Sequence, residues 1–257
     1  MAVQWGRGLL ALCLCLICLP AVARADGPSG ARITGLIARG DAIYDRQMSA
    51  AATRRAIGFY RRALAMNQGS FEALWRTARA FARLADRTRI STGKGSKAAQ
   101  QGYDYAFRAI RASPKRVEGH YWATICIGEY GQDMSVWDAI RKGIRDKFLR
   151  FLRAALRIDP SYDDGGPYRI LGIYHHRLPW PMKSRSKALR FLRRSLTYSP
   201  RYGITHAMLA QVLQEEGRSA AARHHVKACL SARPGGQHPQ MVRRYQRRCA
   251  AMKQKRR

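Results

Sequence analysis

The sequence predicts an all-α protein built from repeated helix pairs, and three observations carry this prediction. Apolar residues recur every three or four positions along almost the whole chain, which is the period of one face of an α-helix. β-branched runs are scarce, and Gly, Pro and Asn divide the chain into helix-sized pieces. With 257 residues, 46% of them hydrophobic, the chain can bury a substantial core. A miniprotein and a largely disordered chain are thereby excluded.

The N-terminal residues 1–25 have the pattern of a secretory signal peptide. Arg7 supplies a basic start, Leu9–Leu19 is nearly all apolar, and Ala23-Arg24-Ala25 fits the small-x-small pattern that signal peptidase cleaves. The apolar run is shorter than the ~20 residues that a membrane-spanning helix needs, so a retained anchor is the alternative. We therefore expect cleavage after Ala25, export to the periplasm or the cell exterior, and one helical repeat domain over residues 26–257.

Eleven helices are expected after this leader, and they form five pairs and a tail. Pro, Gly and Asn at the ends of the segments stop each helix, because Pro lacks an amide donor and Gly and Asn favour turns. In chain order the predicted helices are Ile33–Ser49, Ala51–Met66, Phe71–Ala85, Ala98–Ala112, Val117–Tyr130, Ile140–Ile158, Pro167–His176, Lys183–Thr197, Ile204–Glu216, Ser219–Ala232 and Pro239–Lys253.

The pairs are internal repeats of one another. Similar strings end the second helix of four pairs: Arg61–Asn67, Arg108–Pro114, Arg153–Pro160 and Arg194–Pro200. When the ends are placed at Gln68, Pro114, Pro160, Pro200 and Pro234, the successive steps are 46, 46, 40 and 34 residues. A period in this range is typical of stacked repeat architectures.

The repeats resemble the tetratricopeptide (TPR) family. In the final unit the family's Leu-Gly, Tyr, Ala, Phe, Ala and Pro slots are filled by Leu209-Ala210, Leu213, Ala222, Val226, Cys229 and Pro234. In the fourth unit the matching residues are Leu171-Gly172, Ala188, Leu192, Ser195 and Pro200. The resemblance implies a right-handed superhelix of about five helix pairs, in which the first helices line a concave groove.

The last predicted helix, Pro239–Lys253, is expected to cap the array. Its apolar residues Met241, Tyr245, Cys249 and Met252 form one stripe with arginines around it. A repeat array exposes the apolar side of its final pair unless a helix covers it. We therefore expect the stripe to dock on Val226, Cys229 and Leu230, although a basic amphipathic helix can also adsorb on a membrane.

Two sequence strings and the size of two repeat units resemble a narrower family, the T component of periplasmic TRAP transporters. They are Glu118–Ala123, the enlarged second and third units, and Tyr168–Tyr174 before a Leu-Pro loop. In that family a helical repeat protein associates with the extracytoplasmic substrate-binding subunit, and its hydrophobic pore has been linked to apolar ligands. The resemblance implies a protein partner of that kind and an apolar or amphiphilic small ligand.

The inward positions of the first helices are the candidate ligand contacts. They are Trp75, Arg79, Arg83, Trp122, Glu129, Arg169, His176, Arg177, Gln211 and Gln214. A mixture of Trp and Arg suits an extended peptide, a carboxylate terminus or an amphiphile with an anionic head. Arg169 and Arg177 are eight residues apart on one helix, so we expect both to be exposed beside His176 and to hold an anionic group.

The charge suggests an alternative function. The chain has 48 Lys and Arg against 16 Asp and Glu, a net charge of +32. Many cations fall on second helices, which form the convex face of such a superhelix. This face could hold an anionic polymer or an anionic envelope surface. Nucleic acid is not expected, because aromatic residues are not interleaved with the basic ones. A solvated basic face without a partner is the remaining interpretation.

The remaining chemistry is sparse, and we expect a non-enzyme. No set of Ser/His/Asp or Cys/His residues has a spacing that indicates catalysis. His175-His176 and His224-His225 are the only histidine clusters, and adjacent helical residues point about 100° apart, so neither pair is expected to hold a metal. No cofactor is expected. Beyond the leader the cysteines are Cys126, Cys229 and Cys249; a Cys229–Cys249 disulfide would tie the last two helices together, and three isolated thiols are the alternative.

Overall fold

The computed structural model describes residues 28–92, 94–233 and 239–254, and within them the chain forms twelve α-helices and no strand. The helices are α1 (Pro28–Arg46), α2 (Ala50–Met66), α3 (Phe71–Thr92), α4 (Ser96–Ala112), α5 (Val117–Gly131), α6 (Val136–Arg141), α7 (Ile144–Ile158), α8 (Tyr162–Arg177), α9 (Arg185–Leu196), α10 (Gly203–Glu215), α11 (Ser219–Ser231) and α12 (Pro239–Gln254). The expected signal peptide lies outside the described residues.

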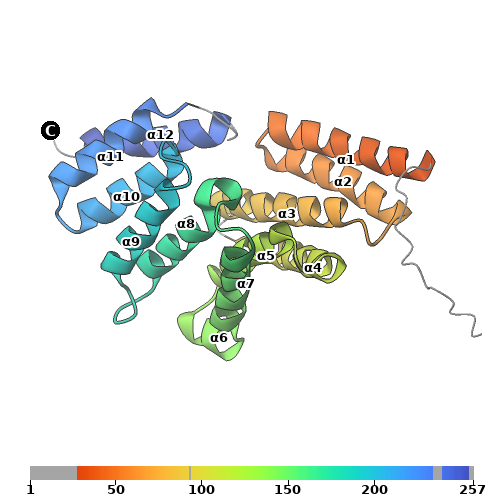
Figure 1. Ribbon diagram of the computed structural model, residues 1–257, viewed down its shortest axis with the longest axis horizontal. Helices are drawn as coiled ribbons and strands as arrows, with labels where there is room; N and C mark the ends of the chain where they lie inside the picture. The colour runs from red at the N-terminus through yellow and green to blue at the C-terminus, as the bar shows by residue number, and fades with distance from the viewer. Residues whose placement is uncertain (1–27, 93, 234–238, 255–257) are drawn as a thin grey trace, which may run out of the picture.

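The helices pack as consecutive antiparallel pairs in two layers. The pairs are α1 with α2, α3 with α4, α5 with α7, α8 with α9 and α10 with α11. We call α1, α3, α5, α8 and α10 the inner layer, and α2, α4, α7, α9 and α11 the outer layer. Figure 1 shows the pairs following one another around an arc, with α1 and α12 facing each other across its open side. The predicted all-α, TPR-like superhelix is confirmed.

Small residues let the helices of the array approach closely. An added Cβ on Gly102 of α4 would lie 2.6 Å from the Sγ of Cys126 and 2.9 Å from the Cβ of Phe81. Around such contacts the core is built of apolar side chains from neighbouring pairs, with Tyr60 and Leu74 in the first cluster and Leu192 and Leu209 in a later one. The spacing of small and large residues in the sequence therefore fixes how the pairs stack.

Four predicted helices differ from the observed ones. The expected helix Ile33–Ser49 is observed as Pro28–Arg46, and the expected helix Phe71–Ala85 extends to Thr92. The other two differ at left-handed turns. The expected helix Ile140–Ile158 is broken at Gly143, whose φ of 61° is left-handed and separates α6 from α7. The expected helix at Pro167 begins earlier, because Tyr162 already starts a turn in which Asp163 and Asp164 have left-handed φ values. At Gly143 a left-handed turn bends the chain where the apolar pattern by itself continues, and in α8 the left-handed turn precedes the apolar pattern.

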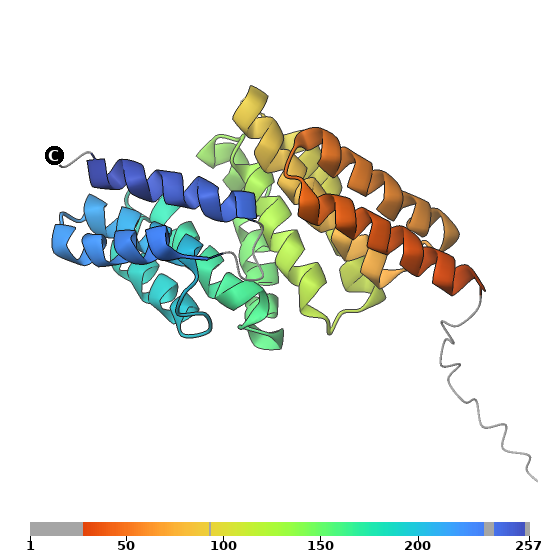
Figure 2. The same ribbon diagram turned by 90° about the horizontal axis from the view of Figure 1, so that it is seen from above.

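The C-terminal helix caps the array as its apolar stripe predicts. Tyr245, Cys249 and Met252 of α12 pack on a cluster that includes Ala210 and Val226. A disulfide joins Cys229 of α11 to Cys249, with the two Cα atoms 6.5 Å apart. Seen from above in Figure 2, α12 lies along the last pair and its first turn points toward the middle of the array.

Candidate functional site

A groove of about 1750 Å³ occupies the concave side of the array. All five inner helices contribute to its lining, together with the residues around α6, the start of α7, the α8–α9 loop and one face of α12. The lining combines apolar and aromatic side chains with eight arginines and six carboxylates. Because the groove is long and mostly apolar, its charged groups decide what part of a ligand each region accepts.

At the α1 end, Asp41 neutralises a cluster of arginines. Its carboxylate accepts hydrogen bonds from Arg76 at 2.8 Å, from Arg79 at 2.8 Å and from the Tyr60 hydroxyl at 2.7 Å. Burial, partly offset by Arg79, raises the pKa of Tyr60, so this phenol stays protonated and donates. The candidate contact Arg79 is thus held by an internal partner.

Arg83, one turn further along α3, has no carboxylate partner among the described residues. Its guanidinium donates to the backbone carbonyl of Tyr44 and lies 3.2 Å from the centroid of the Tyr44 ring. Burial is the main cause that lowers its pKa, and the positive charges of Arg79 and Arg87 act in the same direction. A negative charge brought into the groove would stabilise the charged form of a cation in such surroundings.

Near the middle of the groove, Arg89 bridges α3 to the end of α5. Its guanidinium pairs with Glu129 and lies 2.9 Å from Asp133, and its Nη2 also donates to the backbone carbonyl of Glu129. Burial raises the pKa of Glu129, although Arg89 acts against this shift. These two acids are therefore partners of an arginine, and they show no arrangement for proton transfer.

Arg169 of α8 is a structural residue. Its side chain is 7% exposed and pairs with Asp163, and it donates to the backbone carbonyls of Asp163 and Asp164. The left-handed turn at the start of α8 places these carbonyls toward it, and the ring of Tyr202 lies 4.5 Å from its guanidinium carbon. The expectation that Arg169 is exposed is wrong, because these contacts bury and neutralise it.

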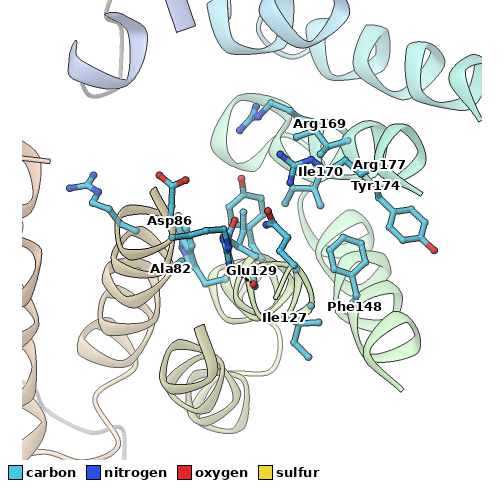
Figure 3. A pocket seen from close by; sticks show the side chains of 18 of the residues that line it. Ala82, Asp86, Ile127, Glu129, Phe148, Arg169, Ile170, Tyr174 and Arg177 are labelled. Carbon is cyan, nitrogen blue, oxygen red and sulfur yellow. Dashed lines mark hydrogen bonds and ion pairs between the residues drawn. The ribbon is translucent and has the colours of Figure 1, made fainter. Parts of the chain in front are cut away.

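Arg177, at the other end of α8, is one of three exposed arginines in the groove lining, together with Arg145 and Arg248. Arg177 forms no hydrogen bond or salt bridge with any residue that the structure describes, while its charge acts on Glu129. Figure 3 shows Arg177 and Ile170 of α8, Glu129 of α5 and Asp86 of α3 around the same space. The groove lining also includes the apolar and aromatic residues Ile125, Phe148, Ile173, Tyr174, Ile204 and Met208.

The C-terminal helix forms one wall of the groove. Met241, Arg244, Tyr245 and Arg248 of α12 belong to the lining. Arg244 Nη1 lies 2.8 Å from the carboxylate of Asp86 on α3, so the last helix reaches back to the second pair. The sequence predicted α12 as a cap and gave no sign of this second role.

Seven of the ten predicted contacts line the groove. They are Trp75, Arg79, Arg83, Trp122, Glu129, Arg169 and Arg177. His176, Gln211 and Gln214 lie outside the lining: Gln211 is 3.5 Å from His176 and 3.3 Å from Glu215, and Gln214 donates to the carbonyl of Met252. Contact between any of these residues and a ligand stays a prediction.

The two layers differ sharply in charge. The outer helices carry nineteen cations, namely Arg54, Arg55, Arg61, Arg62, Lys97, Arg108, Arg111, Arg145, Lys147, Arg150, Arg153, Arg157, Arg185, Lys187, Arg190, Arg193, Arg194, Arg223 and Lys227, against the two acids Asp104 and Asp146. The inner helices carry ten cations and nine acids. No outer cation forms a salt bridge within the described part of the chain. The outer layer is therefore strongly positive, whereas the inner layer is nearly neutral.

Other candidate chemistry is limited in the described ranges. No group of three or more His, Cys, Asp or Glu side chains there could hold a metal ion. His206 and His225 lie with their Nδ1 atoms 2.8 Å apart, which is a histidine pair between α10 and α11. None of the helices described is long and apolar enough to cross a membrane.

Solved structures support the fold. A thermophilic TPR protein of Thermus thermophilus superposes with a TM-score of 0.64 at 18% identity and covers 85% of this chain and 99% of that one. PilF of Pseudomonas aeruginosa superposes with a TM-score of 0.53 at 16% identity, covering 89% and 92%. At these identities the likeness concerns the fold, and superhelices of this kind present extended surfaces that bind protein partners.

Curated relatives correct the expected location. Regulator of microtubule dynamics protein 1 of Bos taurus is 25% identical over 140 residues, which are 52% of this chain and 42% of that protein. The Homo sapiens protein of the same name is 25% identical over 137 residues, 51% of this chain and 42% of that protein. These are animal regulators of microtubule dynamics and not periplasmic proteins, so the expectation of an exported, periplasmic or secreted protein is wrong.

The family assignment rests on more than half of the chain. The family of regulators of microtubule dynamics proteins 1–3 matches residues 36–180, from α1 to the α8–α9 loop. The match covers the strings around Glu118 and Tyr168 that resembled the TRAP T component, and it assigns them to a different family. The chain belongs to the family of regulators of microtubule dynamics proteins 1–3.

Proposed function

We propose that this chain is a non-enzymatic binding protein whose groove holds an elongated amphiphile with an acidic head group. The observation that carries this proposal is the position of Arg177, an exposed cation without a salt bridge in the described structure, beside an apolar region of the groove. A carboxylate or phosphate would meet Arg177 while an apolar chain lies against Phe148 and Ile173. An accessory role in TRAP-type transport is supported only by the sequence strings around Glu118 and Tyr168, and the family assignment does not support it.

The arrangement of α12 favours an elongated small ligand over a long peptide. The Arg244–Asp86 pair joins α12 to α3, so one side of the groove is bounded by a helix that contacts both the last pair and the second pair. A peptide longer than the groove would have to pass this wall, whereas a single acyl-like chain fits within about 1750 Å³. At the α1 end Arg76 and Arg79 are already paired with Asp41, whereas Arg83 has no carboxylate partner among the described residues.

Displacement of a fluorescent amphiphile tests the proposal. The full chain is loaded with 1-anilinonaphthalene-8-sulfonate and titrated with oleate or with oleyl alcohol, which has the same chain without the carboxylate. We expect oleate to displace the probe at lower concentration, and Arg177→Gln to weaken oleate about tenfold without changing oleyl alcohol, because one charge-assisted contact is lost. Arg157→Gln, an exposed arginine of the outer layer, is the matched control. Equal effects of both variants, or no displacement by oleate, would overturn the proposal.

The outer layer favours a second candidate function, binding to an anionic polymer. Its nineteen cations outnumber its two acids, and the name of the family directs this proposal to microtubules. Binding through such a surface depends on many weak charge contacts and is screened by salt.

Co-sedimentation with polymerised tubulin tests this second candidate. Replacement of Arg150, Arg153 and Arg157 of α7 by Gln should weaken binding, and raised salt should weaken it for every variant. Replacement of Arg32, Arg39 and Arg46 of α1 by Gln removes the same charge from exposed inner-layer positions and should have little effect. If the two triple variants bind equally, or if salt has no effect, the outer layer does not bind the polymer.

A further inference from the structure

Three turns of the array lie side by side along one edge of the molecule. The α3–α4 turn contacts the end of α5, where Asp133 accepts hydrogen bonds from Arg89 at 2.9 Å and from the backbone amide of Gly95 at 2.7 Å. The start of α7 contacts the end of α8 through a hydrogen bond of 3.1 Å from Arg145 to the Tyr174 hydroxyl. We call residues 90–92, 94–97, 134–142 and 178–185 the turn edge.

The turn edge concentrates the exposed apolar side chains of the described structure. Trp180 is 89% exposed, Trp137 74%, Ile90 58% and Ile140 50%, and Met182 is also exposed. The exposed large hydrophobic residues elsewhere in the described chain are Met66, Phe107 and Ile158, each no more than 41% exposed. Figure 1 shows α6 and the α8–α9 loop, which carry the two tryptophans, along the lower side of the molecule. Exposed apolar residues gathered in this way mark an interaction surface.

Cations surround these apolar residues. Lys94, Lys97, Lys142 and Arg185 are exposed and form no salt bridge with any described residue. Arg141 and Lys183 are the exceptions, because Arg141 pairs with Asp138 and Lys183 with Glu215. The other acid of this region, Asp133, is held by Arg89. The surface is therefore apolar and aromatic at its centre and cationic around it.

We propose that the turn edge docks on the surface of an anionic lipid bilayer. Trp137 and Trp180 would enter the interfacial region, where an amphipathic aromatic ring is most stable, with Ile90 and Ile140 beside them. The surrounding lysines and Arg185 would meet anionic head groups. An acidic polymer would be recognised by cations alone and would leave these apolar groups in water. Docking is peripheral, since it uses side chains at helix ends and turns.

The docked orientation would bring the groove to the membrane. Ile90, Ile140 and Met182 belong both to the turn edge and to the groove lining. An amphiphile leaving the bilayer would thus meet the groove at this edge. The docking itself is independent of the groove's occupant, because the exposed tryptophans and lysines lie outside the lining.

Vesicle flotation with the full chain tests the proposal. Phosphatidylcholine vesicles with and without phosphatidylserine are compared for the native chain, for Trp137→Ser with Trp180→Ser, and for Met66→Ser with Ile158→Ser. The last pair changes exposed apolar residues outside the turn edge and serves as the matched control. All variants keep residues 1–27, so any contribution of that segment cancels. We expect the tryptophan variant to lose about tenfold or more in binding to phosphatidylserine vesicles, and the control to lose little.

A second measurement separates docking by the turn edge from attraction by the outer layer. Lys94→Glu with Lys97→Glu and Lys142→Glu should abolish the preference for phosphatidylserine, whereas Arg150→Glu with Arg153→Glu and Arg157→Glu should reduce it less. Brominated lipids should quench the native chain more than Trp137→Phe with Trp180→Phe. Helical content measured by circular dichroism checks that every variant folds. Loss of binding with the α7 variant alone, or equal quenching of native and Phe variants, would overturn the proposal.

Discussion

Arg244 Nη1 lies 2.8 Å from Asp86 Oδ2, and this ion pair joins the C-terminal helix to α3 across 158 residues of sequence. Both side chains are about one third exposed, so solvent screens their attraction. The pair therefore matters for the shape of the groove more than for the stability of the fold, because it holds the free side of α12 against the second pair.

A double-mutant cycle on this pair should give a small coupling energy. Asp86→Ala and Arg244→Ala are each expected to change the free energy of unfolding little, with a coupling below about 1 kcal/mol, since the pair is partly exposed. Oleate should nevertheless dissociate faster from both single variants, because each variant lacks the ion pair that holds α12 against α3. Denaturant unfolding measures the coupling, and a value of several kcal/mol would show that the pair is a core element.

Removal of the C-terminal helix should destabilise the array. A chain ending at Pro234 lacks the disulfide and exposes Ala207, Ala210 and Val226 of the last pair. We expect a lower Tm and concentration-dependent aggregation, since a repeat array needs its terminal apolar face covered. Calorimetry and light scattering check this. An unchanged Tm would mean that α12 is a separate arm.

Arg169 and Arg177 should respond oppositely to the same substitution. Arg169→Met removes a buried donor from two backbone carbonyls and leaves Asp163 Oδ2 with the Tyr121 hydroxyl in place of the ion pair, and should cost about 3 kcal/mol of stability. Arg177→Met should change stability by about 0.5 kcal/mol or less, because Arg177 is exposed and forms no salt bridge in the described chain. Urea unfolding curves of the two variants test this contrast.

Stability should fall in mildly acidic solution because of the histidine pair. Burial, followed by the proximity of His206, His224 and Arg193, lowers the pKa of His225 from 6.5 to about 4. Below pH 6.5 the unfolded chain therefore binds a proton that the folded chain does not, so stability falls from that pH and this contribution levels off below about pH 4.

The matched experiment compares Tm against pH for the native chain and for His225→Gln. As the pH falls from 6.5 to 4, the native chain should lose about 1 kcal/mol more stability than His225→Gln, or about 2–4 °C more in Tm, after allowance for the partly exposed ring. Other groups titrate in both chains, so only the difference reports on the pair. Parallel curves would show that this histidine does not contribute.

Two glycine-to-alanine changes should have opposite signs. Gly102→Ala should destabilise by about 1–3 kcal/mol, because its Cβ would overlap Cys126 and Phe81. Gly58→Ala in α2 should stabilise by about 0.5–1 kcal/mol, because nothing lies within 4 Å of its added Cβ and the helix gains propensity. Thermal unfolding distinguishes them.

The fold could be predicted because the same residue pattern recurs in several repeats. The terminal residues Pro114, Pro160 and Pro200 each stop a second helix, and the periodic apolar faces identify the pairs. The break at Gly143 escaped prediction because Ile140 and Ile144 continue the helical spacing across it. A left-handed glycine turn leaves no trace in such a pattern.

The groove was predicted less completely, for a geometrical reason. Positions on α3 and α5 such as Arg83 and Trp122 follow directly from the repeat register. The register fails at Gln211 and Gln214, because Gln211 contacts His176 of α8 and Gln214 contacts the Met252 carbonyl of α12. The contribution of Arg244 depends on the summed rotation of every pair between α3 and α12, which no local sequence pattern records.

The unpaired cations of the outer layer also bear on how the molecule behaves in a concentrated solution. Folding gathers like charges on one surface that the unfolded chain could separate, so mutual repulsion opposes the compact state and added electrolyte should relieve it. The same repulsion acts between copies and keeps convex surfaces apart. Colloidal solubility and conformational stability should therefore change in opposite directions as ionic strength rises.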